Sequence, residues 1–201
     1  MSAERPQWVN VGCGPWRAPA PWWNLDVHRG DGVDPDELVA DYRRPLAEWP
    51  DGSAHRIYLG HVLEHMPWPD TPAFVDDLYR ALAPGGTVMV VGPDLLRVIQ
   101  RWKDNLDPEG WPLIESIMEN PWDRAYGQDG YDVIYESVMW PQARHWWNCY
   151  EHRVVYLLRD LSAFGNATPH AIDSETALPD WPLVAHTRWQ CAVSATKPTE
   201  A

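Results

Sequence analysis

Short apolar runs alternate with segments of helical periodicity along the first hundred residues. The runs have the length and composition of buried strands and cover residues 8–12, 23–27, 38–41, 55–60 and 87–92. Apolar residues recur at helical spacing over residues 71–82 and again after Asp94, whose side chain can cap a helix. Strands that alternate with helices predict a parallel, doubly wound sheet.

The pattern changes in the second half of the chain. Residues 105–150 are punctuated by Trp, Pro and Gly, and a long irregular insertion in a compact fold is usually a lid or a substrate wall. A predicted helix over 154–161 precedes two strands near 170–172 and 184–195, which we expect to pair antiparallel. The predicted fold is α/β: a Rossmann-like doubly wound sheet, mostly parallel with an antiparallel C-terminal strand, plus an irregular, partly helical lid insertion.

Length and composition narrow the class of protein. A chain of 201 residues suits one domain, here residues 1–201, with a full hydrophobic core. The formal net charge of −13 repels a phosphate backbone, so duplex nucleic acid is a disfavoured partner. Three scattered cysteines indicate neither a disulfide framework nor a metal site and favour the cytoplasm. With no secretory leader and no apolar run of about 20 residues, we expect no membrane association, and the oligomeric state stays open.

Candidate ligand-binding residues follow three of the predicted strands. Gly12 and Gly14 form a turn after the first strand, Asp26 lies at the end of the second, and the loop 60–65 follows the strand at 55–60. In open parallel sheets, ligands bind outside the carboxyl ends of the strands. Glycines let the main chain approach a ligand closely, and a carboxylate at a strand end can accept hydrogen bonds from both ribose hydroxyls. These residues predict one nucleoside-bearing ligand.

The segment after the glycine turn indicates which kind of nucleoside ligand the predicted site would hold. Three prolines lie between Gly14 and Trp22, so the first crossover helix should be short or absent. No long helix would then present its N-terminus to a pyrophosphate. A ligand without phosphates therefore fits better than a nicotinamide dinucleotide, and a nicotinamide oxidoreductase stays as an alternative.

Five segments appear in a characteristic order: VNVGCG at 9–14, WNLD at 23–26, HVLEH at 61–65, LYRALAPGG at 78–86 and VGPDL at 91–95. Together they resemble the class I S-adenosylmethionine-dependent methyltransferases, specifically the branch with a short first helix and an N-x-G-C-G turn. The resemblance covers roughly residues 8–96. It implies an enzyme that uses S-adenosylmethionine to methylate an acceptor.

Carried over by position, the resemblance implies a set of donor-binding residues: Asn10, Gly12, Cys13, Gly14, Arg17, Asp26, Asp41, Gly60 and His61. In this reading the glycines approach the methionine moiety, Asp26 binds the ribose and Asp41 faces the adenine amino group. Asp41 could equally be a surface acid or an ion-pair partner.

The chain departs from the family pattern in the first loop. Asn10 stands where the family often has an acid, and Trp16 occupies the third glycine position. Because the first loop departs from the family pattern, Arg17 could form an ion pair with the carboxylate of the donor.

The sulfonium of the donor already activates its methyl group, so alignment with the nucleophile can supply most of the acceleration. A general base is needed only if the acceptor must lose a proton, and the candidates are His61, His65 and His145. Aromatic residues of the insertion are predicted to enclose a small or medium-sized acceptor, or else form a satellite core: Tyr126, Tyr131, Trp146 and Trp147. A nucleic-acid or protein methyltransferase and a donor-binding module without turnover remain alternatives.

Overall fold

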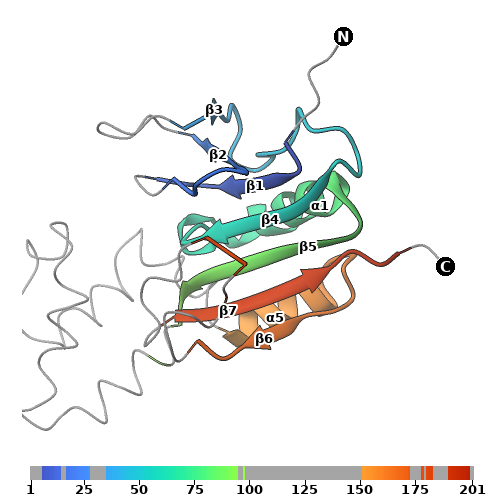
Figure 1. The fold of residues 1–201 in the computed structure, drawn as a ribbon. Coiled ribbons are helices and arrows are strands. Elements are labelled where there is room, and N and C mark those ends of the chain that lie inside the picture. The colour runs from blue at the N-terminus through green and yellow to red at the C-terminus, as the bar shows by residue number, and fades with distance from the viewer. Residues whose placement is uncertain are drawn as a thin grey trace, which may run out of the picture.

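The chain folds around a seven-stranded sheet (Figure 1). The computed structural model describes residues 6–14, 17–27, 35–94, 97, 151–172, 178, 180–182 and 190–199. The strands are β1 (Trp8–Val11), β2 (Trp22–Asp26), β3 (Glu37–Leu38), β4 (Ala54–Gly60), β5 (Leu82–Pro93), β6 (Thr168–His170) and β7 (Gln190–Thr196).

The strand order confirms the predicted architecture. The sheet runs β3-β2-β1-β4-β5-β7-β6, so the chain builds outward from β1 first in one direction and then in the other. Strands β1 to β5 pair in parallel. Strand β7 pairs antiparallel with both β5 and β6, as expected for the closing strands.

The two described α-helices, α1 (Thr71–Ala81) and α5 (Glu151–Asp160), pack against the same face of the sheet and lie behind it in Figure 1. Helix α1 has a proline in its first turn, where the missing N–H costs no helical hydrogen bond. Its apolar side chains, spaced for one helix face, enter the main core with strand residues such as Leu25, Ile57 and Val90. None of the described helices is long and apolar enough to cross a membrane.

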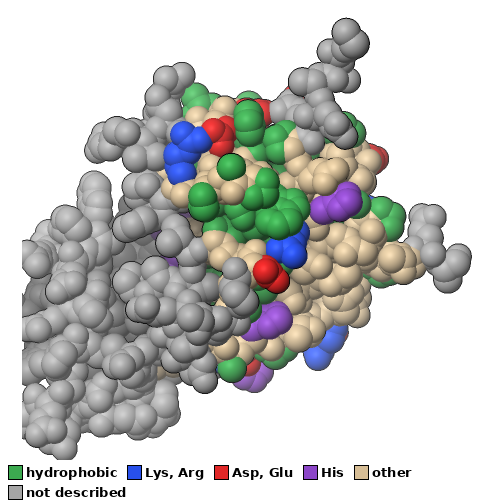
Figure 2. Space-filling model, viewed as in Figure 1, with side chains coloured by type: hydrophobic (Ala, Val, Ile, Leu, Met, Phe, Trp, Pro, Cys, Tyr) green, Lys and Arg blue, Asp and Glu red, His purple; other side chains and the backbone are tan. Residues whose placement is uncertain are grey.

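The opposite face of the sheet carries a second, aromatic-rich cluster. The rings of Trp22 and Tyr58 meet edge to face with centroids 6.3 Å apart, and Trp181 packs on both. Figure 2 shows hydrophobic side chains gathered on this face. The described residues between β1 and β2 contain no helix, which agrees with the predicted short or absent first helix.

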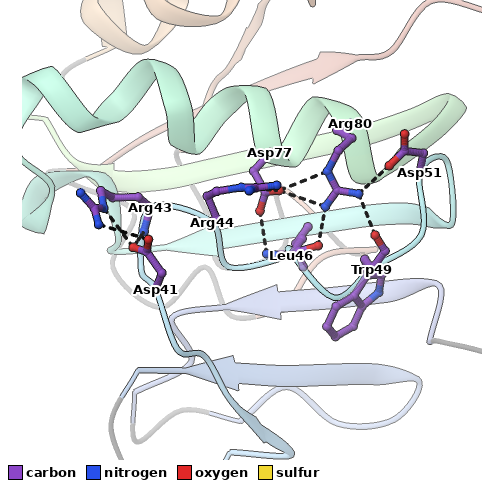
Figure 3. A network of polar contacts seen from close by, with 8 residues as sticks. All are labelled: Asp41, Arg43, Arg44, Leu46, Trp49, Asp51, Asp77 and Arg80. Atoms are coloured by element: carbon purple, nitrogen blue, oxygen red, sulfur yellow. Dashed lines mark hydrogen bonds and ion pairs between the residues drawn. The ribbon is translucent and has the colours of Figure 1, made fainter.

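Two short 3-10 helices follow β4: η1 (Leu63–His65) and η2 (Trp68–Asp70). Beyond them, α1 anchors the loop between β3 and β4 through the buried carboxylate of Asp77 (Figure 3). Asp77 accepts hydrogen bonds from the amide of Leu46 at 2.8 Å and from Arg80 at 2.9 Å. Arg80 also donates to Asp51, and these carboxylates raise its pKa although burial alone would lower it.

Some predicted boundaries were wrong. The strand predicted at 38–41 is limited to Glu37–Leu38, because the ladder to β2 ends where the amide of Val39 donates to the carbonyl of Asp26. Strand β5 begins at Leu82, and the residues before Thr87 form an irregularity opposite β4. The lid insertion predicted at 105–150 lies outside the described residues.

Candidate active site

The register of the parallel strands sets three predicted site residues side by side. Val11 of β1 pairs with Leu25 of β2 and with Leu59 of β4. The residues that follow these partners, Gly12, Asp26 and Gly60, therefore stand next to one another at the carboxyl edge of the sheet. This is the edge where a parallel sheet binds ligands.

The glycine turn is fastened to β2. Gly12 and Gly14 have φ angles of +69° and +50°, a region in which glycine carries no steric cost. The amides of Gly12 and Cys13 donate to the carbonyl of Leu25 at 2.8 and 3.0 Å. The amide of Gly14 donates to the carboxylate of Asp26 at 2.7 Å. The turn and the candidate ribose ligand thus form one unit.

Space around the two glycines differs. A Cβ built on Gly12 would lie 2.5 Å from a methyl carbon of Val62, so the turn packs directly against the loop after β4. A Cβ built on Gly14 meets no heavy atom of the described structure within 4 Å. Gly14 therefore leaves room for a ligand beside Asp26, and these residues fit a nucleoside-bearing donor.

Asn10 takes part in a buried network beneath the turn. Its side-chain amide donates to Oδ1 of Asn24 at 2.9 Å. The same oxygen accepts from the amide of Ala18 at 2.8 Å, while Nδ2 of Asn24 donates to the carbonyl of Ala18 at 3.1 Å. Asn10 and Asn24 thus support the segment that replaces a first helix.

Arg17 forms an ion pair with Asp36. Asp36 also accepts from the main-chain and side-chain amides of Asn24, at 2.8 and 3.0 Å. Burial opposes ionisation of Asp36, but these hydrogen bonds outweigh it and lower its pKa. Pairing of Arg17 with the carboxylate of the donor stays a prediction, because the ion pair with Asp36 does not test it.

Asp41 lies in a turn three residues beyond the end of β3. It accepts from Nε and Nη2 of Arg43 at 3.0 and 3.2 Å (Figure 3). These bonds hold the pKa of Asp41 below its usual value. The structure therefore shows Asp41 as an ion-pair partner of Arg43. Its role in binding adenine stays a prediction.

The imidazole of His61 contacts the side chains of Glu64 and Gln190. His61 adopts a φ of +58°, uncommon for a residue with a Cβ, and its amide donates to the carbonyl of Val91 at 2.8 Å. Its Nδ1 lies 2.8 Å from Oε1 of Glu64, and its Nε2 contacts the side-chain amide of Gln190. His65, the other described candidate base, is exposed at the end of η1.

Gly60 and Tyr58 pack closely on one face of β4. A Cβ on Gly60 would lie 2.7 Å from the ring of Tyr58, so glycine lets the aromatic side chain lie flat along the strand. Burial and then the charge of Glu64 raise the pKa of Tyr58, which keeps its hydroxyl protonated.

Arg97 joins three elements near this edge. Asp94 accepts from the amide of Arg97 at 3.3 Å, in agreement with its predicted capping role. The guanidinium lies 3.2 Å from Asp94 and 2.9 Å from Glu151 of α5. It also donates to the carbonyl of Gln190 at 3.1 Å, which fixes the start of β7 beside His61.

Sequence reasoning missed Gln190 and gave Asn24 no role. Gln190 is separated from His61 by 129 positions, and only the pairing of β7 with β5 brings it to the site. No local pattern could have found it. The remaining candidates, which lie outside the described residues, are His145, Tyr126, Tyr131, Trp146 and Trp147.

A family model described as "Methyltransferase domain" matches residues 9–90, about two-fifths of the chain. The match spans the glycine turn, Asp26 and the His61 loop. No curated protein matches the chain significantly.

The fold is similar to that of a solved methyltransferase structure. The plantazolicin methyltransferase BamL, in complex with a triazolic desmethylPZN analog and SAH, has a TM-score of 0.53 at 10% identity, over 94% of this chain and 76% of that chain. An S-adenosylmethionine-dependent methyltransferase from Methanosarcina mazei has a TM-score of 0.49 at 12% identity, over 96% of this chain and 92% of that one. At such identities the likeness concerns the fold alone.

Residues 9–90 are thus similar to a methyltransferase domain, and the fold is similar to that of a solved methyltransferase. This is the class of enzyme that the ordered sequence segments predict.

Proposed function

We propose that the chain transfers a methyl group from S-adenosylmethionine to a small or medium-sized acceptor by in-line displacement, and that residues 1–201 form a single methyltransferase domain. The observation that carries the proposal is the glycine turn bonded to Asp26 at the carboxyl edge, within the segment that matches the methyltransferase family. When bound, the donor supplies a methyl group already activated by a sulfonium.

Different candidate residues are proposed for the different chemical groups of the donor. We propose that the carboxylate of Asp26 binds the ribose, since Gly14 orients it and the space beside Gly14 is open among the described residues. Gly12, Cys13, Gly60 and the main chain of His61 are the candidates for the methionine moiety. We further propose Asp41 for the adenine and Arg17 for the carboxylate of the donor.

The proposal for the acceptor is based on the net charge of the chain and on the types of the candidate residues. A net charge of −13 disfavours a polyanionic substrate and suits a small molecule. Tyr126, Tyr131, Trp146 and Trp147 are the aromatic side chains we propose for its pocket. His61, His65 and His145 are the candidate bases for an acceptor that must lose a proton.

Calorimetry with S-adenosylhomocysteine, S-adenosylmethionine and a nicotinamide dinucleotide tests the donor. We expect both sulfur nucleosides to bind and the dinucleotide not to bind; the reverse result would indicate an oxidoreductase. Incubation with methyl-labelled donor and a metabolite extract then tests the acceptor. Label in a small molecule is expected, and label confined to macromolecules would contradict the proposal.

A further inference from the structure

The guanidinium of Arg153 packs over the indole ring of Trp68. Arg153 lies in the first turn of α5, and Trp68 is the first residue of η2. The Cζ atom of Arg153 lies 3.4 Å from the centroid of the indole ring. A contact of this kind holds the cation over the ring and does not use its N–H groups, which lie in the plane of the guanidinium.

The stacked pair joins two segments that converge on the carboxyl edge of the sheet. On one side, η2 belongs to the connection that begins with His61 after β4. On the other side, Glu151 lies two positions before Arg153 and forms an ion pair with Arg97. Arg97 also donates to the main-chain carbonyl of Gln190, whose side chain contacts His61. Both segments are therefore fastened near the edge that carries the candidate donor residues.

Arg153 differs from the other cations of the described structure because it has no oxygen partner. Within the part of the chain that the structure describes, its guanidinium forms no hydrogen bond and no ion pair. The net charge of the chain is −13, so acidic partners are abundant elsewhere. Each of the other described arginines and lysines pairs with a carboxylate or a carbonyl oxygen: Arg17, Arg43, Arg44, Arg56, Arg80, Arg97, Arg159 and Lys197.

The unpaired guanidinium is partly buried. Nε of Arg153 is buried and has no hydrogen-bond partner among the described residues. Nη1 and Nη2 have no such partner either, but they are not among the buried unpartnered atoms and therefore reach solvent. A charged donor that gives up water without gaining an acceptor costs free energy. An anion that binds Nη1 and Nη2 from outside would compensate this charge.

The geometry of the guanidinium selects the class of ligand. Nη1 and Nη2 present N–H groups in a fixed fork, which matches two oxygens of a carboxylate or of a phosphate. Because Trp68 already holds the guanidinium, little side-chain freedom is left to lose when such an anion binds.

We propose that Arg153, held by Trp68, binds a carboxylate or a phosphate group of the methyl acceptor through Nη1 and Nη2. The inference rests on the proposed function, because it assigns the ligand of Arg153 to the acceptor of methyl transfer. It restricts the acceptor to a small molecule that carries an anionic group in addition to the atom that receives the methyl group.

NMR of the full chain labelled with 15N-arginine tests the anion site without turnover, with methyl phosphate and acetate as probes. Arg153→Gln assigns the Nε–H signal of Arg153. We expect a probe to shift this signal with a Kd on the order of 10 mM, since one ion pair of this kind gives only weak binding. The probe that binds more tightly distinguishes phosphate from carboxylate.

Arg159 is the internal control of the titration, because it lies on the same helix and is paired with Asp160. Its signal should not move. An Arg153 signal that neither probe shifts, or that shifts only together with the signal of Arg159, would overturn the proposal.

Turnover tests the link to the acceptor. With methyl-labelled donor and a metabolite extract, we expect the labelled product to carry a carboxylate or a phosphate, as mass spectrometry shows. With that acceptor, Arg153→Gln should raise KM roughly 30-fold and leave kcat and the Kd for S-adenosylhomocysteine unchanged, because Arg153 binds the acceptor and not the donor. Arg159→Gln is the matched control and should have the KM of the wild type.

The outcomes separate this inference from the proposed function. A labelled product without an anionic group, or a wild-type KM in Arg153→Gln, would contradict the role of Arg153. Should Arg153→Gln not fold, Arg153→Lys replaces it, and KM should rise several-fold because lysine keeps the charge but loses the fork. Failure of the wild type to bind S-adenosylhomocysteine would count against the proposed function, and the titration would still decide whether Arg153 binds an anion.

Discussion

The main-chain amide of Gly14 donates a 2.7 Å hydrogen bond to the carboxylate of Asp26, across the gap between two parallel strands. The bond fixes the rotation of the carboxylate and the position of the turn at the same time. Asp26 is partly exposed, so a ligand at the edge of the sheet can reach it. The relationship makes Asp26 the first residue to test for donor binding.

Substitution of Asp26 should weaken donor binding strongly. Two charge-assisted hydrogen bonds to a ribose contribute about 1.5–3 kcal/mol each, so Asp26→Ala should raise the Kd for S-adenosylhomocysteine by about 100-fold or more. Calorimetry measures this directly. Asp76→Asn, on the exposed side of α1, is the matched control and should bind like the wild type. Equal affinities of Asp26→Ala and wild type would refute the assignment.

Gly12 should tolerate no side chain. Gly12→Ala places a methyl group 2.5 Å from Val62 at a φ of +69°, and we expect a loss of about 2–3 kcal/mol in the free energy of unfolding. Gly52 has the same φ, but its Cβ would approach nothing closer than 4.0 Å. Gly52→Ala should therefore cost only about 1 kcal/mol. Urea denaturation compares the two, and similar losses would show that the contact with Val62 is unimportant.

The buried carboxylate of Asp77 should contribute to stability and not directly to the donor site. Asp77→Ala leaves the amide of Leu46 and the guanidinium of Arg80 without their acceptor, which should cost about 3 kcal/mol. Asp76→Ala, one position earlier and exposed, should change stability by less than about 0.5 kcal/mol. Thermal or urea unfolding measures both. A stable Asp77→Ala variant would show that this network is dispensable.

The thiol of Cys13 should resist alkylation. Burial, and then the negative charge of Asp26, raises the pKa of Cys13 from 9.0 to about 11. Because the thiolate is the reactive form, its alkylation rate should keep rising with pH up to about 11 and not level off near 9.0. Mass spectrometry of the Cys13 peptide measures the rate.

The variant Asp26→Asn tests whether the charge of Asp26 contributes to the raised pKa of Cys13. Removal of the carboxylate charge should move the midpoint of the alkylation profile to lower pH, and burial should keep it above 9.0. A midpoint that does not move in Asp26→Asn would show that burial alone protects the thiol.

The sequence by itself determined the order of the elements and the edge of the sheet at which the candidate donor-binding residues lie. Strand-length apolar runs and helical spacing encode the alternation locally, and the glycines and Asp26 directly follow such runs. Since parallel strands present their carboxyl ends at one edge, the positions of Gly12, Asp26 and Gly60 followed without coordinates.

Only the tertiary structure decided which side chains surround them. The amide of Asn10 turns into the network of Asn24, and Gln190 reaches His61 because β7 pairs antiparallel with β5. The physical reason is that sequence periodicity records which face a residue occupies, while a contact between distant strands depends on their register. That register is settled by packing of the whole sheet, so the contact of Gln190 with His61 carried no signal in the sequence.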